Sequence, residues 1–440
     1  MYRSIVGMLV FVVGILYTPT LVSAHGLVAG GSRVIEVDAG MHQLRIEAIV
    51  PTGAPTTLTL KILPDSPLVG AGTVTVAARS LSGARVAPQV VSIPAGLVTI
   101  AVVDIPITST GAWDIEVIID DDQRQPGVVL VPVMIQSAEV PLATVPLFFG
   151  FGLIALVLTV QVLWLAAPAW VGMVSRTLMV ASLTFVGALG LVSVSPQVRL
   201  EWNTPLPQPM PFISQQVTMT DTDILFRLYD GSTGLPVDDV VPHHNALMHT
   251  VCIDDGNNAL VHVHPARSSA GVFVLSRQHI PPGTYTCSIE TERIYSGSNV
   301  TSVDLSVPGN DIQLPAPGAL DVPQFIDGYD VQVQAEQRIL AGVPVSLKLS
   351  IERAGVPVEG IQPWLGMRGH LIVRSVDTQL YGHVHAAGTM DEAFQPATQP
   401  GHTVTFVYAF PQAGSYTLWF QVRIDGNILT IPVTVRAEGA

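Results

Sequence analysis

Three histidines recur twice along this chain with the same spacing. Each copy holds a lone histidine that is followed, thirteen residues later, by a His-Val-His triplet. Two histidines separated by one residue project from the same face of a strand, because strand side chains alternate with period two. A third imidazole from a neighbouring strand would complete a set suited to a borderline transition metal. The predicted metal ligands are His249, His262 and His264 in the first copy, and His370, His383 and His385 in the second.

The repeat extends beyond the histidines. Pro236 and Pro357 each stand thirteen residues before the lone histidine, and a glycine turn precedes Tyr285 and Tyr416 downstream. Neighbouring positions differ between the copies, whereas the three histidines remain in both. This favours metal binding over the simpler interpretation that the histidines are hydrogen-bonded and inert. A pH switch, driven by repulsion between protonated imidazoles, is a further interpretation.

Copper is the metal that we predict, and zinc also suits three imidazoles. Met248 and Met367 could offer a thioether to Cu(I), but their offsets from the lone histidine differ, which is typical of packing residues. No Ser/His/Asp set, phosphate loop or HExxH motif accompanies the histidines, so we predict binding rather than an enzyme. Four histidines without a counterpart in the other copy are peripheral candidates: His243, His244, His279 and His402.

The composition excludes one large class of partner. The 34 acidic residues exceed the 20 basic ones, and the formal net charge is −14. A nucleic-acid surface needs clustered Lys and Arg to neutralise phosphates, so nucleic acid is not an expected partner. Hydrophobic residues reach 48% and charged residues only 12%, which indicates that part of the chain lies in a membrane.

The first half of the chain carries apparent export and membrane signals. Residues 1–24 have the charged start, apolar stretch and small-residue end of a signal peptide. Cleavage there would leave His25 first, with an amine and a ring nitrogen that can chelate Cu(II) together. Two uncharged apolar runs within residues 142–195 predict a transmembrane helical hairpin that contacts lipid. Arg176 in its turn would face the cytoplasm, which predicts localisation in the cytoplasmic membrane with both flanking parts on the extracytoplasmic side.

Outside these runs the sequence reads as short strands separated by Gly and Pro turns. The predicted fold class is all-β, with immunoglobulin-like β-sandwiches flanking the two-helix transmembrane hairpin. The predicted sandwich domains span residues 25–138, 212–308 and 325–438. A glycine turn leads into an aromatic residue in all three, at Trp113, Tyr285 and Tyr416, which resembles an immunoglobulin-type corner. Both cysteines, Cys252 and Cys287, lie in the first histidine repeat, where a disulfide between two strands is expected.

Two resemblances follow from these motifs. The segment with Ala24-His25-Gly26 and Gly111-Ala112-Trp113 resembles the CopC and YtkA-like exported β-sandwiches, which are associated with copper handling; His25 carries over by position, and His42 is a possible second ligand. The repeats resemble histidine-bearing β-domains of bacterial membrane proteins linked to copper or other heavy metals. Together they imply a membrane-anchored exported protein that binds and buffers copper or delivers it to a copper-accepting membrane protein. The alternative is a structural or interaction ectodomain with immunoglobulin-like modules and no metal.

Overall fold

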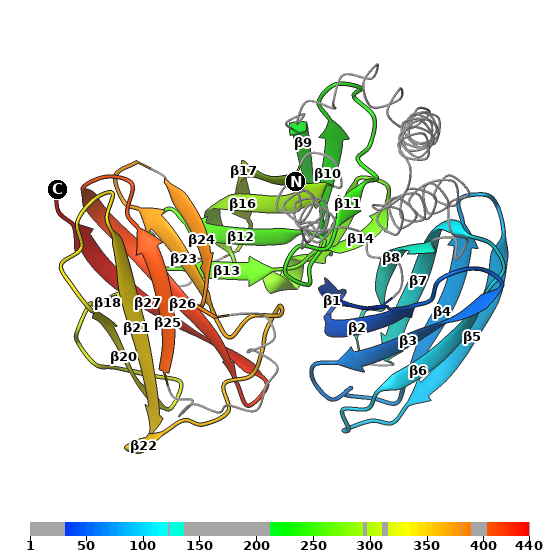
Figure 1. Ribbon diagram of the computed structural model, residues 1–440, viewed down its shortest axis with the longest axis horizontal. Coiled ribbons are helices and arrows are strands. Elements are labelled where there is room, and N and C mark those ends of the chain that lie inside the picture. Colours follow the sequence, from blue (N-terminus) through cyan, green and yellow to red (C-terminus); the bar gives the residue numbers. More distant parts are fainter. Residues whose placement is uncertain are drawn as a thin grey trace, which may run out of the picture.

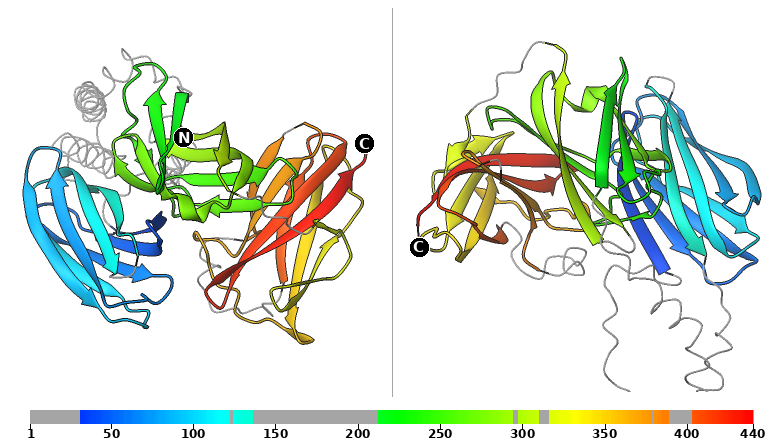
Figure 2. Two further views of the ribbon diagram at one scale, coloured as in Figure 1. Left: turned by 180° about the vertical axis from the view of Figure 1, so that it is seen from behind. Right: turned by 90° about the horizontal axis from the view of Figure 1, so that it is seen from above.

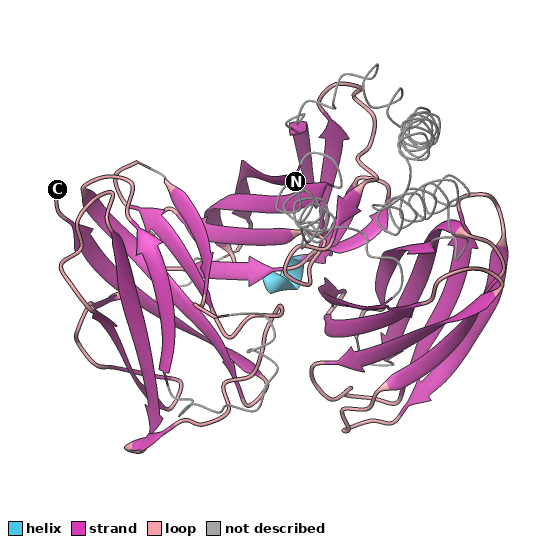
Figure 3. Cartoon of the chain, in the orientation of Figure 1, coloured by secondary structure: helices cyan, strands magenta, loops and turns pink. Residues whose placement is uncertain are grey.

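The computed structural model describes residues 31–121, 124–135, 212–293, 297–309, 316–378, 380–388 and 403–439. These residues form three β-sandwich domains, each with two sheets around an apolar core. They are the N-terminal domain (31–135), repeat domain 1 (212–309) and repeat domain 2 (316–439). Repeat domain 1 lies between the other two (Figures 1 and 2). The described elements are strands, apart from one 3-10 turn, η1 (Arg277–His279), as Figure 3 shows.

The N-terminal domain stacks two four-stranded antiparallel sheets, ordered β1-β2-β3-β6 and β5-β4-β7-β8. Every second side chain of β2 is buried, so this sheet has one core face and one outer face. The edge strand of the first sheet is β1, and it faces the repeat domains. The strands are β1 (Gly31–Ala39), β2 (His42–Val50), β3 (Thr56–Pro64), β4 (Gly72–Ser80), β5 (Arg85–Ile93), β6 (Ala101–Ile107), β7 (Gly111–Asp121) and β8 (Gly127–Ile135).

Repeat domain 1 pairs the sheet β14-β15-β10-β9 with the sheet β11-β16-β12-β13, and β17 also pairs with β16. The strands are β9 (Phe212–Met219), β10 (Asp223–Asp230), β11 (Val240–Val241), β12 (His249–Asp254), β13 (Leu260–Val263), β14 (Ala266–Ser269), β15 (Val272–Ser276), β16 (Gly283–Arg293) and β17 (Gly297–Val307).

Repeat domain 2 has the same plan, with the sheet β18-β27-β26-β23-β24 and the sheet β19-β20-β21-β22, in which β25 also pairs with β21. The strands are β18 (Gly318–Ala319), β19 (Gln324–Ile326), β20 (Tyr329–Ala335), β21 (Pro344–Arg353), β22 (Val356–Pro357), β23 (His370–Ser375), β24 (Tyr381–His385), β25 (Thr403–Ala409), β26 (Gly414–Ile424) and β27 (Asn427–Ala437).

The strands that begin with the lone histidines are buried on both faces. All six residues of β23 are buried, as are the first five of β12. One face of each strand covers its own domain core, and the other packs against the partner repeat. An apolar cluster with members from both repeats, including Val251, Ile372 and Trp419, fills that contact. The two histidine-bearing sheets therefore stack through their outer faces.

The N-terminal domain also closes on this contact. Asp38 on β1 forms a parallel bridge with Pro265 of repeat domain 1. Ion pairs join the N-terminal domain to both repeats. A guanidinium nitrogen of Arg267 lies 2.9 Å from Asp114 Oδ1, and one of Arg423 lies 3.1 Å from Asp65 Oδ1. The edge of β1 is thereby covered by the repeat domains rather than left as an open template for further pairing.

The aromatic corners expected from the sequence are confirmed in all three domains. The side chains of Trp113, Tyr285 and Tyr416 each donate a hydrogen bond to the carbonyl four residues upstream, at 3.0, 3.0 and 2.8 Å. The glycine two residues before each aromatic has a positive φ, of 109° to 153°, which a residue with a Cβ rarely adopts. These bonds fix the turn that leads into β7, β16 and β26.

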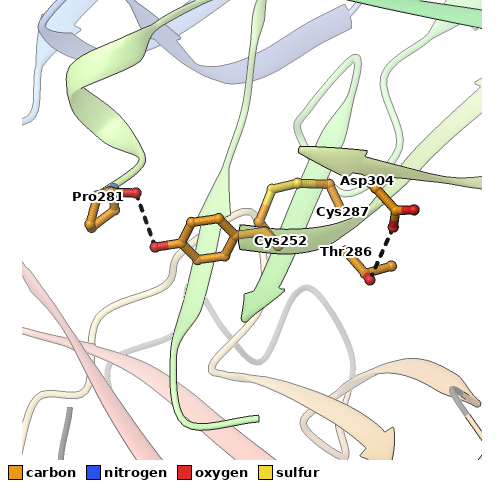
Figure 4. The surroundings of a disulfide bond; sticks show 6 residues. Cys252, Pro281, Thr286, Cys287 and Asp304 are labelled. Carbon is orange, nitrogen blue, oxygen red and sulfur yellow. Dashed lines mark hydrogen bonds between the residues drawn. A yellow bond between two sulfur atoms is a disulfide. The ribbon is translucent and has the colours of Figure 1, made fainter. Parts of the chain in front are cut away.

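The expected disulfide is also present. Cys252 on β12 and Cys287 on β16 are directly opposite one another in the strand register, and their sulfurs lie 2.03 Å apart (Figure 4). Both side chains belong to the core of repeat domain 1. Because successive side chains of a strand point to opposite faces, the disulfide lies on the opposite side of β12 from His249. The disulfide is therefore not part of the histidine face.

The membrane part of the predicted fold class is wrong. Within the described ranges, no helix is long and apolar enough to span a membrane. These residues instead alternate buried and exposed positions with the period of strands, which suits sandwiches. The predicted two-helix anchor, and the cytoplasmic-membrane localisation that rested on it, are therefore not supported. The segment 142–195 and the predicted signal peptide 1–24 both lie outside the described residues.

Candidate metal centre

Strand register brings the three histidines of each repeat together on one face. In repeat domain 2, His370 is directly opposite His385, and His383 is opposite Ile372. In repeat domain 1, His262 is opposite Val251, two residues from His249. Directly paired residues of antiparallel strands point to the same side, so each lone histidine joins its His-Val-His neighbours. The potential ligand atoms within each triad all lie within 4.8 Å of one another.

Backbone carbonyls set the proton position on the two lone histidines. The Nε2 atom of His249 lies 2.9 Å from the carbonyl oxygen of His243, and that of His370 lies 3.1 Å from the carbonyl oxygen of Trp364. A carbonyl can only accept a hydrogen bond, so Nε2 carries the proton in both rings. In the neutral rings, Nδ1 then directs a lone pair toward the rest of its triad.

These two carbonyls belong to matching tight turns. Backbone hydrogen bonds run in both directions between His243 and Ala246, and likewise between Trp364 and Met367. The second residue of each turn has a positive φ, 46° at His244 and 51° at Leu365. The turns therefore give both lone histidines the same orientation even though their sequences differ.

The middle histidine of each triad is held by a side chain from the other repeat. His262 Nδ1 donates to Gln421 Oε1 at 2.9 Å, and His383 Nδ1 donates to Glu290 Oε2 at 2.9 Å. Glu290 is opposite His249 in the strand register, as Gln421 is opposite His370. The Gln421 amide donates in turn to Thr430, which supports its oxygen facing His262. When these rings are neutral, both middle histidines therefore turn an unprotonated Nε2 toward their own triad.

The third histidine of each triad has a ring nitrogen without a hydrogen-bond partner. Both His264 Nε2 and His385 Nε2 are buried and unpaired. Asp38 orients His264, because its carboxylate accepts the His264 backbone N–H at 2.6 Å and lies 3.6 Å from ring Nδ1. An unsatisfied buried nitrogen is costly unless something binds it. A metal ion at each triad would use these nitrogens, so the donor set fits such an ion.

Burial favours the neutral, metal-binding form of four of the six triad histidines. Burial, reinforced by the neighbouring imidazoles, holds the pKa values of His249, His262 and His370 well below the usual range. The same causes lower the pKa of His385 to about 3.

The two triads form one cluster rather than two separate groups. Ring centroids of His262 and His383, from opposite repeats, lie 5.2 Å apart, and those of His249 and His383 lie 5.6 Å apart. These distances match those within a triad, such as 5.6 Å between His249 and His262. The indole of Trp364 borders both sets, at 5.1 Å from His262 and 4.8 Å from His370.

The remaining histidine predictions have mixed outcomes. The rings of His244 and His385 are tilted against each other with centroids 3.8 Å apart, and the His243 ring lies 3.9 Å from that of His244, so both residues join the cluster. His279 does not, because it bonds the carbonyl of Gly40, and His42 lies buried in the N-terminal domain. Met248 packs in the core of repeat domain 1, away from the histidine face. The structure does not describe His25 or His402.

Sequence reasoning missed the residues that orient the ligands. A signal for two of them was present, because Glu290 and Gln421 each lie five residues after the corner tyrosine. A polar residue at the same position of both copies suggests a shared contact. No comparable pattern pointed to Asp38, which comes from a different domain.

Comparisons with known proteins leave the function open. A family model described as "Domain of unknown function (DUF8832)" matches residues 214–300 and 324–439, which lie within the two repeat domains. No curated protein matches the chain. Nothing in these matches bears on the resemblance to CopC and YtkA-like domains, which stays a prediction.

Solved structures with similar stretches are distant. A tetra-tandem repeat from the extending region of a large adhesion protein is 9% identical, covers 93% of this chain and 74% of its own, and has a TM-score of 0.18. Dimeric latent PorU from Porphyromonas gingivalis is 9% identical, covers 92% and 33%, and has a TM-score of 0.16. A Salmonella alpha-2-macroglobulin variant is 10% identical, covers 91% and 22%, and has a TM-score of 0.17. Similarity at this level says nothing about the histidine cluster.

Proposed function

We propose that the protein binds transition-metal ions, copper foremost, at the two histidine triads between its repeat domains. One observation carries the proposal: His249 Nδ1 faces His262 Nε2 at 3.3 Å, and His370 Nδ1 faces His383 Nε2 at 3.1 Å. The other nitrogen of each ring already donates its proton to an oxygen. In neutral rings, both facing nitrogens therefore present lone pairs, which repel unless a cation lies between them.

A purely structural role for the cluster accounts less well for these contacts. It would need a shared proton between the facing nitrogens, and hence an imidazolium in each triad. Burial opposes that charge on His249, His262 and His370, whose pKa values it lowers, and this leaves only His383, beside the Glu290 carboxylate, to carry it among these four rings. A metal ion satisfies the same nitrogens and the unpaired Nε2 atoms of His264 and His385 at once.

Copper is favoured by the chemistry of the donors. Imidazole nitrogen suits copper, zinc, iron and nickel, and among divalent ions copper binds such sites most strongly. Zinc also accepts three imidazoles with a fourth position left for water. Met248 packs in the core of repeat domain 1 and offers no thioether to the triads, and we propose Cu(II), which three imidazoles suit, as the preferred form.

Metal titration of the purified full chain tests the proposal. We expect two copper ions per chain after removal of loosely bound metal by dialysis, measured by elemental analysis. The double variant His249→Ala, His262→Ala should retain one ion, and adding His370→Ala and His383→Ala should leave none. His279→Gln, a histidine outside the cluster, is the matched control and should retain both. An unmutated chain that binds neither copper nor zinc near stoichiometry would overturn the proposal.

A further inference from the structure

We infer that the two triads make one dinuclear centre, in which two metal ions interact and share a small oxygen anion, such as hydroxide. This inference rests on the proposed metal binding and goes beyond it, because two ions could also bind at independent sites. Three observations carry it: the spacing of the rings across the interface, the crossed support of the middle histidines, and the charge balance of the site.

Ring spacing leaves little room for separation between the ions. The ring centroid of His262 lies 5.2 Å from that of His383 in the other triad, compared with 4.9 Å from that of His264 in its own triad. His262 also lies 5.7 Å from His370. The rings of the two triads are therefore about as close to each other as the rings within one triad, so an ion held at one triad lies near ligands of the other. Two-metal sites of this kind hold their ions about 3.5–4 Å apart, with an oxygen between them.

The crossed support couples the two sites through the interface. Gln421 of repeat domain 2 holds the ring of His262, and Glu290 of repeat domain 1 holds the ring of His383. Neither triad has its middle ring oriented unless the partner repeat is docked. Outer-shell contacts of this type typically change metal affinity by about 10- to 100-fold. Filling one site, which rigidifies the interface, should therefore strengthen binding at the other.

The charge balance identifies the class of bridging ligand. Two divalent ions with six neutral imidazoles bring a large positive charge into a partly buried interface. The buried carboxylates of Asp38 and Glu290 lie against ligand rings and offset part of it. Charge that remains uncompensated in such a site is costly. Three protein ligands leave a coordination position on each ion, and a hydroxide shared by these positions would supply the remaining negative charge.

Paramagnetic resonance of the copper(II)-loaded full chain tests this inference without any mutation. At half occupancy and at full occupancy, the spin intensity is compared with total copper from elemental analysis. We expect the fully loaded chain to show less spin intensity than its total copper, or a half-field transition, because neighbouring Cu(II) spins couple. Two independent signals that account for all the copper, with no half-field feature, would overturn the dinuclear centre while leaving metal binding intact. Failure to bind copper at all would instead overturn the proposed function.

Variants provide the matched comparison. The His370→Ala, His383→Ala chain should bind one copper with an uncoupled signal of full intensity, as should the His249→Ala, His262→Ala chain. Circular dichroism checks that each variant keeps its strand content. An uncoupled signal from the single-site variants and a coupled one from the unmutated chain support the inference. Identical signals per copper in all three chains contradict it.

Discussion

The two repeat domains build equivalent triads with unequal support. In repeat domain 2, the middle ring of His383 bonds a carboxylate, and Glu290 also accepts a hydrogen bond from Tyr381 at 2.5 Å. In repeat domain 1, the middle ring of His262 bonds the neutral amide of Gln421. A carboxylate partner raises the basicity of an imidazole ligand more than an amide does. Both repeats carry the same three ligands but different groups behind them, and the second triad should therefore bind its ion more tightly.

Separation of the repeats should have the largest effect, because both triads depend on the docked interface. Val251→Asp would place a carboxylate in the apolar contact beside His262, and an unpaired buried charge costs several kcal/mol. We expect the loss of both metal ions, measured by elemental analysis, and an expanded particle by small-angle scattering. Val300→Asp, at an exposed position of β17, is the control and should retain both ions. Retention of either ion in Val251→Asp would show that a triad works alone.

Removal of the disulfide should destabilise repeat domain 1 more than repeat domain 2. Replacing Cys252 and Cys287 with alanine removes a link across a separation of 35 residues, which costs about 3–4 kcal/mol by loop-closure entropy. We expect a lower unfolding midpoint for repeat domain 1. Hydrogen exchange of the backbone amides in its strands measures this loss of stability. Exchange in the core of repeat domain 2 is the internal reference and should change less. Equal loss of protection in both domains would mean that they unfold as one unit.

Substitution of Glu290 or Gln421 by the other residue's type should reduce the difference in metal affinity between the two triads. Glu290→Gln should weaken the second site by about 10- to 100-fold, because the His383 ring loses its carboxylate partner. The reciprocal Gln421→Glu should strengthen the first. Competition titrations against a chelator give the two binding constants. If Glu290→Gln leaves the tighter constant unchanged, the carboxylate does not set the order of binding.

Asp38 should have the smallest effect. Its carboxylate lies 3.6 Å from His264 Nδ1, beyond ordinary hydrogen-bond distance, so it acts on the ring mainly through charge. Asp38→Asn keeps an oxygen for the His264 backbone N–H and should weaken mainly the first site, by no more than about tenfold. The same titration measures it. Equal weakening of both sites would assign Asp38 to closure of the whole interface instead.

Much of the all-β organisation could be read from local patterns. The Gly-x-aromatic motifs predicted the corners at Trp113, Tyr285 and Tyr416, because a positive-φ glycine before a packed ring is a local requirement. The pairing of Cys252 with Cys287 was also within reach, since they are the only cysteines. The membrane prediction rested on apolar runs within residues 142–195, which lie outside the described residues, and no helix among the described residues is long and apolar enough to span a membrane. Among the described residues, the apolar side chains instead alternate along strands.

The sequence by itself determined that the two histidines of each His-Val-His triplet share one strand face, because spacing and period-two alternation are local properties of the chain. The lone histidine joins them only through the register of the neighbouring strand. Tertiary structure decided that this face is the outer one, that the two faces stack, and that Glu290, Gln421 and Asp38 stand behind the ligands. Those contacts join residues more than 90 positions apart, such as His383 and Glu290, which are separated by 93. No local periodicity encodes them, since they exist only once three separately folded sandwiches have buried their surfaces against one another.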